Sequence, residues 1–176
     1  MIDVSYIYEI TPYIMSGLKT TLIVFTLTML FSIPIGLILG ILSSYNKLFI
    51  KNIISVYTWV FRGTPLLLQL YFGMYGLPAF GITLDRMTVA VLIFALNYGA
   101  YFTEIFRGSI FSIDKGQEEV SETLGFTRVQ TYFYIIIPQA VKRSIQTVGN
   151  ETISLVKDTA LIAAIASPEE VQLSKD

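Results

Sequence analysis

The sequence contains no cysteine and no histidine, and these absences exclude several classes of function. Without cysteine the chain has no disulfide and no thiol nucleophile, and without either residue it lacks the ligands of a Cys/His zinc site. A Ser-His-Asp triad is excluded for the same reason. No G-x-x-x-x-G-K-S/T motif is present, so any ATP must be hydrolysed by a partner.

Charged residues are also scarce. They make up 14% of the 176 residues, against 53% hydrophobic residues, whereas a soluble domain carries about 25% charge. The net charge of −1 gives no reason to expect a nucleic-acid partner. The N-terminus is acidic where a signal peptide would be basic, and the first apolar run is too long for a signal sequence, so we predict a retained membrane span.

Long uncharged runs predict an all-α membrane protein with one membrane domain. A spanning helix needs about 20 mostly apolar residues. Four segments approach or exceed that length, and the last is interrupted by Gly149, Asn150 and Glu151. The predicted spans are residues 20–46, 53–75, 87–106 and 138–156. The membrane domain is predicted to cover 20–166, with an extracytoplasmic segment at 1–19 and a polar C-terminal end at 167–176.

Three local features predict how these spans pack, break and begin. Gly36 and Gly40 form a G-x-x-x-G motif, which lets another helix approach closely. The Arg-Gly-Thr-Pro sequence at 62–65 breaks the second span and frees backbone groups that need protein or water around them. Pro138 suits the first turn of the fourth helix, where its missing N–H costs nothing.

The distribution of basic residues predicts the orientation, because cytoplasmic loops collect Lys and Arg. Only Lys19 and Arg86 lie near the ends that would then be outside. The opposite ends carry Lys47, Lys51, Arg107, Lys115, Arg128, Lys142 and Arg143. We therefore predict an outside N-terminus and a cytoplasmic location for the loop at 114–138.

That loop is predicted to form two short helices. The spacing of Asp114 with Gln117, and of Thr127 with Gln130, matches a capping box in each case. Gly125, between the boxes, can end the first helix in the left-handed conformation. The first helix also carries an apolar stripe, formed by Val120 and Leu124, suited to docking on a partner outside the membrane. A cytoplasmic helix without a partner is the alternative.

Ionisable residues within the predicted spans are candidates for a solute path. A charge in the hydrocarbon costs about 2.5–3.5 kcal/mol on insertion scales, so it usually faces a cavity or a partner. A guanidinium suits a carboxylate, and acids suit an ammonium or guanidinium. The candidates are Arg62, Glu104, Glu151 and Asp158, with Asn97 as a neutral hydrogen-bonding group. The alternatives are internal ion pairs, such as Glu104 with Arg107, and helix packing for Asn97.

Several motifs resemble those of bacterial ABC importers. Glu119-Val-Ser121, Gly125 and Ile137-Pro138 resemble the EAA loop of their membrane subunits, with Val and Ser in place of the two alanines. Further stretches resemble the branch that carries polar amino acids, the histidine/glutamine/arginine permease-like family. They are 61–69, 96–108, 112–117 and 149–159, in the family's order, and the resemblance covers nearly all of residues 12–166.

The resemblance implies a type I ABC importer transmembrane domain with no catalytic residue, cofactor or metal of its own. It implies a coupling helix at about 114–125 that docks on a separate ATPase subunit, and the coupling residues are Glu119, Val120, Ser121, Gly125 and Pro138. The implied partners are an ATPase dimer that binds ATP and Mg, a second identical or similar permease subunit, an extracytoplasmic amino-acid-binding protein and membrane lipid. The implied location is the bacterial cytoplasmic (inner) membrane, crossed several times.

The chain departs from the family in one respect, and four alternatives to an amino-acid permease remain. Members of the family have five core helices, but only four spans fit here, so the fifth is predicted to be missing and the chain truncated after 160–166. The alternatives are a permease for another small solute, a non-functional fragment, a stand-alone channel, and an intramembrane enzyme using the buried carboxylates. The last lacks His, Cys and a tight acidic cluster.

Overall fold

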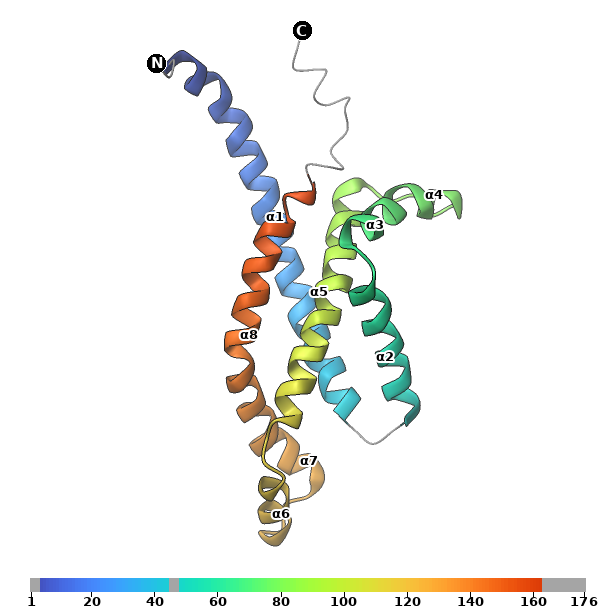
Figure 1. The fold of residues 1–176 in the computed structure, drawn as a ribbon, viewed down its shortest axis with the longest axis vertical. Coiled ribbons are helices and arrows are strands. Elements are labelled where there is room, and N and C mark those ends of the chain that lie inside the picture. Colours follow the sequence, from blue (N-terminus) through green and yellow to red (C-terminus); the bar gives the residue numbers. More distant parts are fainter. Residues whose placement is uncertain (1–3, 45–47, 163–176) are drawn as a thin grey trace.

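A helical bundle makes up the computed structural model, which describes residues 4–44 and 48–162. Within those residues every regular element is a helix, and no strand occurs. The long helices run roughly along the long axis of the molecule (Figure 1). They are α1 (Val4–Ser44), α2 (Leu48–Gly63), α5 (Arg86–Phe111) and α8 (Ile137–Asp158). The all-α prediction is confirmed.

Small residues bring α1 and α5 together at the centre of the bundle. A Cβ atom at Gly36 would lie 2.3 Å from the Cβ of Phe102, and one at Gly40 would lie 2.9 Å from the Cβ of Phe106. Thr28 lies two turns before Gly36 on the same face and is fully buried. The predicted close packing through G-x-x-x-G is therefore confirmed.

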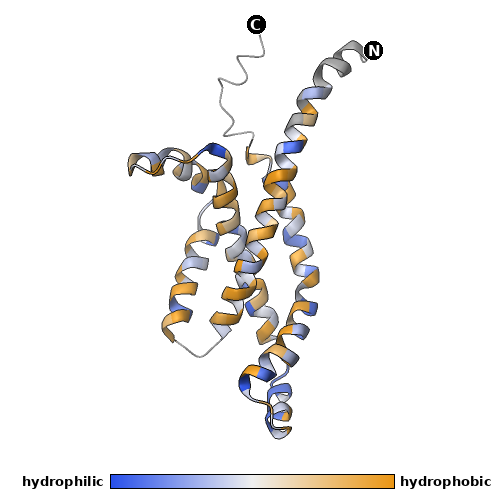
Figure 2. Cartoon of the chain, turned by 180° about the vertical axis from the view of Figure 1, so that it is seen from behind, coloured by the Kyte–Doolittle hydropathy of each residue, from blue (hydrophilic) through white to orange (hydrophobic). Residues whose placement is uncertain are grey.

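Two helices in the described ranges are long and apolar enough to cross a membrane, Gly17–Ser44 within α1 and Arg86–Phe111. Apolar residues predominate along these helices, whereas the loop that follows α5 carries many polar residues (Figure 2). Because α1 already begins at Val4, most of the predicted 1–19 segment is part of the same helix. The predictions for residues 45–47 and 163–176 lie outside the described residues.

The predicted second span, 53–75, is not one continuous helix, and the predicted break at 62–65 is confirmed. Helix α2 ends at Gly63, and the chain continues through α3 (Leu66–Tyr71), the π-helix η1 (Phe72–Gly76) and α4 (Leu77–Ala79). These short elements turn away from the direction of α2 (Figure 1). Pro65 causes the break, because it cannot donate to the helix and disfavours helical geometry at the residue before it.

Each of two π-helical turns ends two residues before a proline. The N–H of Leu77 donates to the carbonyl of Phe72 in η1. In the second π-helix, η2 (Tyr132–Ile136), the N–H of Ile137 donates to the carbonyl of Tyr132. A proline ring clashes with the carbonyl four residues earlier. For Pro78 and Pro138 that carbonyl lies inside the π-helical turn. The wider hydrogen-bonded loop of a π-helix leaves space for the proline ring.

The polar loop contains two short helices, as predicted. They are α6 (Gly116–Thr123) and α7 (Arg128–Thr131). Gly125 adopts a left-handed φ of +83°, as expected. The Thr127–Gln130 capping box is confirmed. The Asp114–Gln117 box is wrong, because Lys115 is the N-cap and the Asp114 carboxylate accepts from the N–H of Gly116 at 2.7 Å.

Helix α8 follows η2 without a break and carries Pro138 in its first turn, as predicted. Gly149, Asn150 and Glu151 interrupt the apolar run but do not break the helix, which is continuous to Asp158. A single glycine costs a helix interior only about 1 kcal/mol, which packing can offset.

Asp85 sets the start of α5 at the opposite end. Its carboxylate accepts from the N–H of Thr88 at 2.9 Å and from the Thr88 hydroxyl. The hydroxyl and the N–H of Thr88 hold the pKa of Asp85 below its ordinary value. The cap therefore stabilises α5 above the ordinary pKa of an aspartate, and this contribution is lost as the pH falls through the lowered pKa.

Gly36→Ala tests the close approach of α1 and α5. The added methyl group would also lie 2.9 Å from the backbone carbon of Phe102, so no side-chain rotation relieves it. We expect a loss of about 1–3 kcal/mol, measured as thermal unfolding in detergent. Gly17→Ala is the control in the same helix, because nothing lies within 4 Å of its Cβ position. Equal stability of the two variants would contradict the packing.

Candidate functional site

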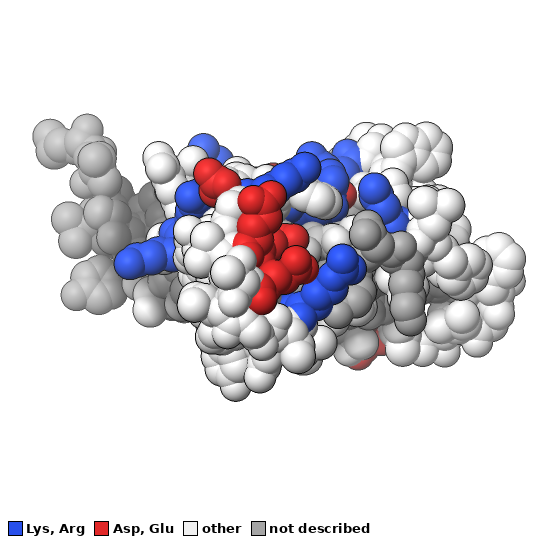
Figure 3. Space-filling view, turned by 90° about the horizontal axis from the view of Figure 1, so that it is seen from below, with Lys and Arg blue, Asp and Glu red and all other residues white. Residues whose placement is uncertain are grey.

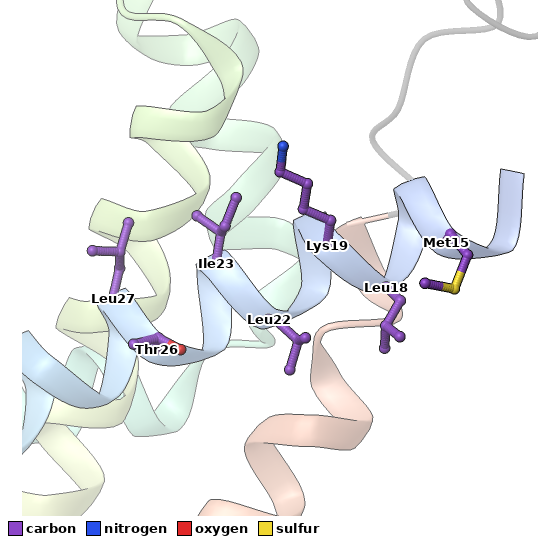
Figure 4. Close-up of a pocket in the computed structure, with 7 residues that line it drawn as sticks. All are labelled: Met15, Leu18, Lys19, Leu22, Ile23, Thr26 and Leu27. Atoms are coloured by element: carbon purple, nitrogen blue, oxygen red, sulfur yellow. The ribbon is translucent and has the colours of Figure 1, made fainter. Parts of the chain in front are cut away.

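An apolar hollow on α1 does not have the features of a solute site. Its lining residues all come from one helix and project to different sides of it (Figure 4). They are Met15, Leu18, Lys19, Leu22, Ile23, Thr26 and Leu27. A solute site combines a concave surface with several converging polar groups. This surface is better suited to hydrocarbon chains of the membrane.

A polar cavity of about 690 Å³ lies where the end of α2, the middle of α5 and the later half of α8 meet. It is large enough for a small organic solute. Four of the five residues predicted for the solute path line it, Arg62, Asn97, Glu151 and Asp158. The other lining residues are Gly63, Thr64, Pro65, Leu66, Leu67, Tyr98, Tyr101, Ser154 and Leu161. We call it the main cavity.

The wall of the main cavity is braced at the break after α2. The side-chain amide of Asn97 donates to the carbonyl of Phe61 at 2.8 Å and to Gln69 at 3.1 Å. Gln69 in turn donates to the same carbonyl at 2.9 Å and to the Thr64 hydroxyl at 2.7 Å. Asn97 is only 4% exposed and both its contacts are internal. Its position therefore supports the helix-packing alternative as well as a lining role.

The acidic wall comes from one face of α8. Glu151, Ser154 and Asp158 are spaced by three and four residues, so they project from the same side of the helix. The hydroxyl of Tyr98, from α5, donates to Asp158 at 2.7 Å. That bond fixes one acid, whereas no hydrogen bond to the Glu151 carboxylate is found within the described residues.

Glu104 lies outside the main cavity, in a smaller neighbouring cavity of about 410 Å³. We call this the Glu104 cavity. Arg107 donates to the Glu104 carboxylate from two nitrogens, and the Thr58 hydroxyl donates to its other oxygen at 3.1 Å. The predicted Glu104–Arg107 pair is confirmed. Arg62 lines both cavities and approaches Glu104 only to 3.9 Å.

The loop end of the molecule exposes a polar helix with apolar side chains. In α6, Val120 is 60% exposed and Leu124 just beyond it is 70% exposed, whereas Ser121 is buried. Acidic side chains cluster at this end, with basic ones around them (Figure 3). The acids of α6 are Glu118, Glu119 and Glu122, all exposed. The predicted apolar stripe is therefore exposed in this structure.

Two side chains of α8 hold this end against the bundle. Arg143 donates to the carbonyl of Ser112 and, at 3.2 Å, to its hydroxyl. Gln139 donates to the carbonyl of Ile135 in η2 at 2.9 Å and lies 3.5 Å from the side chain of Gln117 in α6. The start of α8 therefore contacts both Ser112, at the end of α5, and Gln117 in α6.

Sequence reasoning missed several residues of this site. Gln69 was not predicted, although it lies between the broken backbone and Asn97. Tyr101 and Ser154 could have been found from helical spacing, since each lies three or four residues from a predicted residue on the same helix. Within the described residues, no group of three or more acidic side chains is placed to hold a metal ion.

An all-helical membrane domain with a polar cavity among its helices and an exposed helical loop at one end is the architecture of a solute-translocating subunit. Residues 32–173 match the family described as the inner membrane component of binding-protein-dependent transport systems. The chain belongs to this family of permease subunits, which are membrane proteins and are not themselves catalytic.

Two bacterial permease proteins are similar to this chain over nearly its whole length. The L-cystine transport system permease protein TcyB of Bacillus subtilis (strain 168) is 40% identical, over 90% of this chain and 68% of the relative. The glutamine transport system permease protein GlnP of Escherichia coli (strain K12) is 36% identical, over 95% and 77%.

A solved structure shares the fold. The crystal structure of an amino acid ABC transporter with histidines superimposes with a TM-score of 0.85 at 35% identity, covering 95% of this chain and 78% of that one. The expectation of an importer-type transmembrane domain is confirmed at the level of the fold.

Gln69→Met tests the brace at the broken backbone. Methionine keeps the length of the side chain but removes the donors to Phe61 and Thr64 and the acceptor for Asn97. We expect thermal unfolding in detergent to show a loss of about 1–3 kcal/mol, because partly buried acceptors lose their donors. Leu68→Met, at a neighbouring residue that is 60% exposed, is the control and should change little.

Proposed function

We propose that this chain is the transmembrane permease subunit of an ATP-driven importer that moves polar amino acids across the bacterial cytoplasmic membrane. The main cavity carries the proposal, because it places one guanidinium and two carboxylates around a space of about 690 Å³. Relatives named for cystine and glutamine transport support an amino acid as solute.

The charges of the main cavity complement both ends of an amino acid. The guanidinium of Arg62 presents a planar fork of donors to the α-carboxylate. The Glu151 carboxylate accepts no hydrogen bond from the described residues, so it is the better acceptor for the α-ammonium group, whereas Asp158 is already held by Tyr98. Asn97 shapes the wall. The surplus of acids tolerates a cationic side chain on the solute.

The exposed loop supplies the coupling surface in this proposal. Val120 and Leu124 provide the apolar contact for an ATPase subunit, and Glu119 adds a charged one. Buried Ser121 seats α6 on the rest of the chain, and Gly125 makes the turn that presents it. Pro138, after η2, sets the angle between this loop and α8.

The remaining partners follow from the same proposal. The N-terminus lies outside, the chain crosses the membrane several times, and the loop with α6 lies in the cytoplasm. The C-terminal end of α1 and the N-terminal end of α2 lie toward the same end of the molecule as α6 and α7, as that orientation requires (Figure 1). A second permease subunit and two ATPase subunits complete the assembly, ATP and Mg bind to the ATPases, and an extracytoplasmic binding protein delivers the amino acid.

Glu151→Gln tests the role of the main cavity. Loss of this charge should weaken uptake of labelled amino acid into proteoliposomes by on the order of tenfold, which corresponds to about 1.4 kcal/mol. Lys157→Gln is the control, since it changes a charge on the same helix outside the cavity. The proposal requires uptake of at least one polar amino acid by the wild-type assembly. Uptake that is equal in wild type and Glu151→Gln would remove this residue from the solute path.

Leu124→Asp tests the coupling surface. This side chain is 70% exposed, so the change should leave the fold intact but place a charge in an apolar contact. We expect loss of co-purification with the ATPase and loss of solute-stimulated ATP hydrolysis. Phe80→Asp is the matched control, because Phe80 is 75% exposed near the opposite end of the bundle. A stand-alone channel would tolerate both substitutions equally.

A further inference from the structure

Arg62 occupies an unusual position, because it and Gly63 are the two residues that line both cavities. Its guanidinium lies over the ring of Tyr101, 5.1 Å from the centroid, and Tyr101 faces the main cavity. One of its nitrogens lies 3.9 Å from Glu104 in the other cavity. The side chain therefore has one possible partner on each side.

Neither contact holds Arg62 firmly. A distance of 3.9 Å exceeds that of a hydrogen bond, so the contact with Glu104 is a loose ion pair. The stacking on Tyr101 is of the cation–π kind, which leaves the N–H donors at the edge of the guanidinium free. The Arg62 side chain is also 42% exposed, which leaves it room to move.

Glu104 does not depend on Arg62 for its charge. Arg107 donates to it from two nitrogens, and Thr58 donates to its second oxygen. Movement of Arg62 away from Glu104 would therefore leave that carboxylate still paired. Because Arg107 already neutralises much of the charge on Glu104, the attraction between Glu104 and Arg62 at 3.9 Å is weak.

We infer that Glu104 competes with the α-carboxylate of the solute for Arg62. The two carboxylates are alternative partners of the same guanidinium. When the solute occupies the main cavity, Arg62 turns toward its carboxylate. When Arg62 returns to Glu104, the carboxylate is released. The strength of the Glu104–Arg107 pair sets the balance, so Arg107 tunes solute affinity from outside the cavity that binds the solute. This inference rests on the proposed function.

The competition predicts opposite effects for two neighbouring substitutions. Glu104→Gln removes the rival charge while keeping an acceptor for Thr58, so solute should bind several-fold more tightly but be transported more slowly. Arg107→Gln removes the main partner of Glu104, which then holds Arg62 more strongly, so solute should bind several-fold more weakly. A purely structural role for the cluster would make both substitutions act in the same direction.

The test measures equilibrium binding and uptake with the assembled transporter, using labelled L-glutamine, L-cystine and L-arginine. Arg62→Ala should weaken binding of the preferred amino acid by tenfold or more, and should have little effect on binding of its α-amide, which lacks the carboxylate. In the Arg62→Ala background, Glu104→Gln should no longer change the affinity. Lys51→Gln, on the exposed surface of α2, is the charge control.

The outcomes separate this inference from the function on which it rests. If the wild-type assembly binds none of the three amino acids, the proposed function fails. If it binds one of them, but Glu104→Gln weakens binding or acts equally with and without Arg62, the competition is wrong. If Glu104→Gln does not assemble, Arg107→Gln decides alone, since tighter or unchanged binding in that variant overturns the inference.

Discussion

The broken backbone after α2 is the constraint on which the rest of the site depends. Where a helix stops inside a membrane domain, its last carbonyls need donors from protein or water. Here the carbonyl of Phe61 receives two, from Asn97 on α5 and from Gln69 on α3. These bonds fix the end of α2 against the middle of α5, and so they place Arg62 at the edge of a polar space rather than against lipid.

The packing of α1 on α5 provides the rigid frame for this space. Because Gly36 and Gly40 allow the two backbones to approach, α5 is held along its length and can present one polar face to α2 and α8. Helix α8 then connects the main cavity with the loop that contains α6. Its later half carries Glu151 and Asp158, whereas its first turns contact the loop with α6 through Gln139 and Arg143.

The sequence predicted the parts of this arrangement that depend on local chemistry. The all-α fold, the turn at Gly125 and the glycine packing motif follow from hydrophobic run length and from the conformational freedom of glycine. The path of the chain after Pro65 could not be predicted in this way, because hydropathy alone does not register a change of direction. Nor could the division between two cavities, since it depends on contacts between helices far apart in the sequence, such as those of Thr58 and Arg62 in α2 with Glu104 in α5.

The absence of cysteine makes one direct measurement of the solute path possible. Ser154→Cys would place the only thiol of this chain in the wall of the main cavity, and Ile153→Cys would place one on the exposed surface beside it. In the assembled transporter, labelling of each by a small charged thiol reagent would be followed with and without polar amino acids. We predict that a transported amino acid protects the Ser154→Cys site and leaves the Ile153→Cys site unprotected. Equal labelling of Ser154→Cys with and without an amino acid that the assembly transports would contradict a solute path through this cavity.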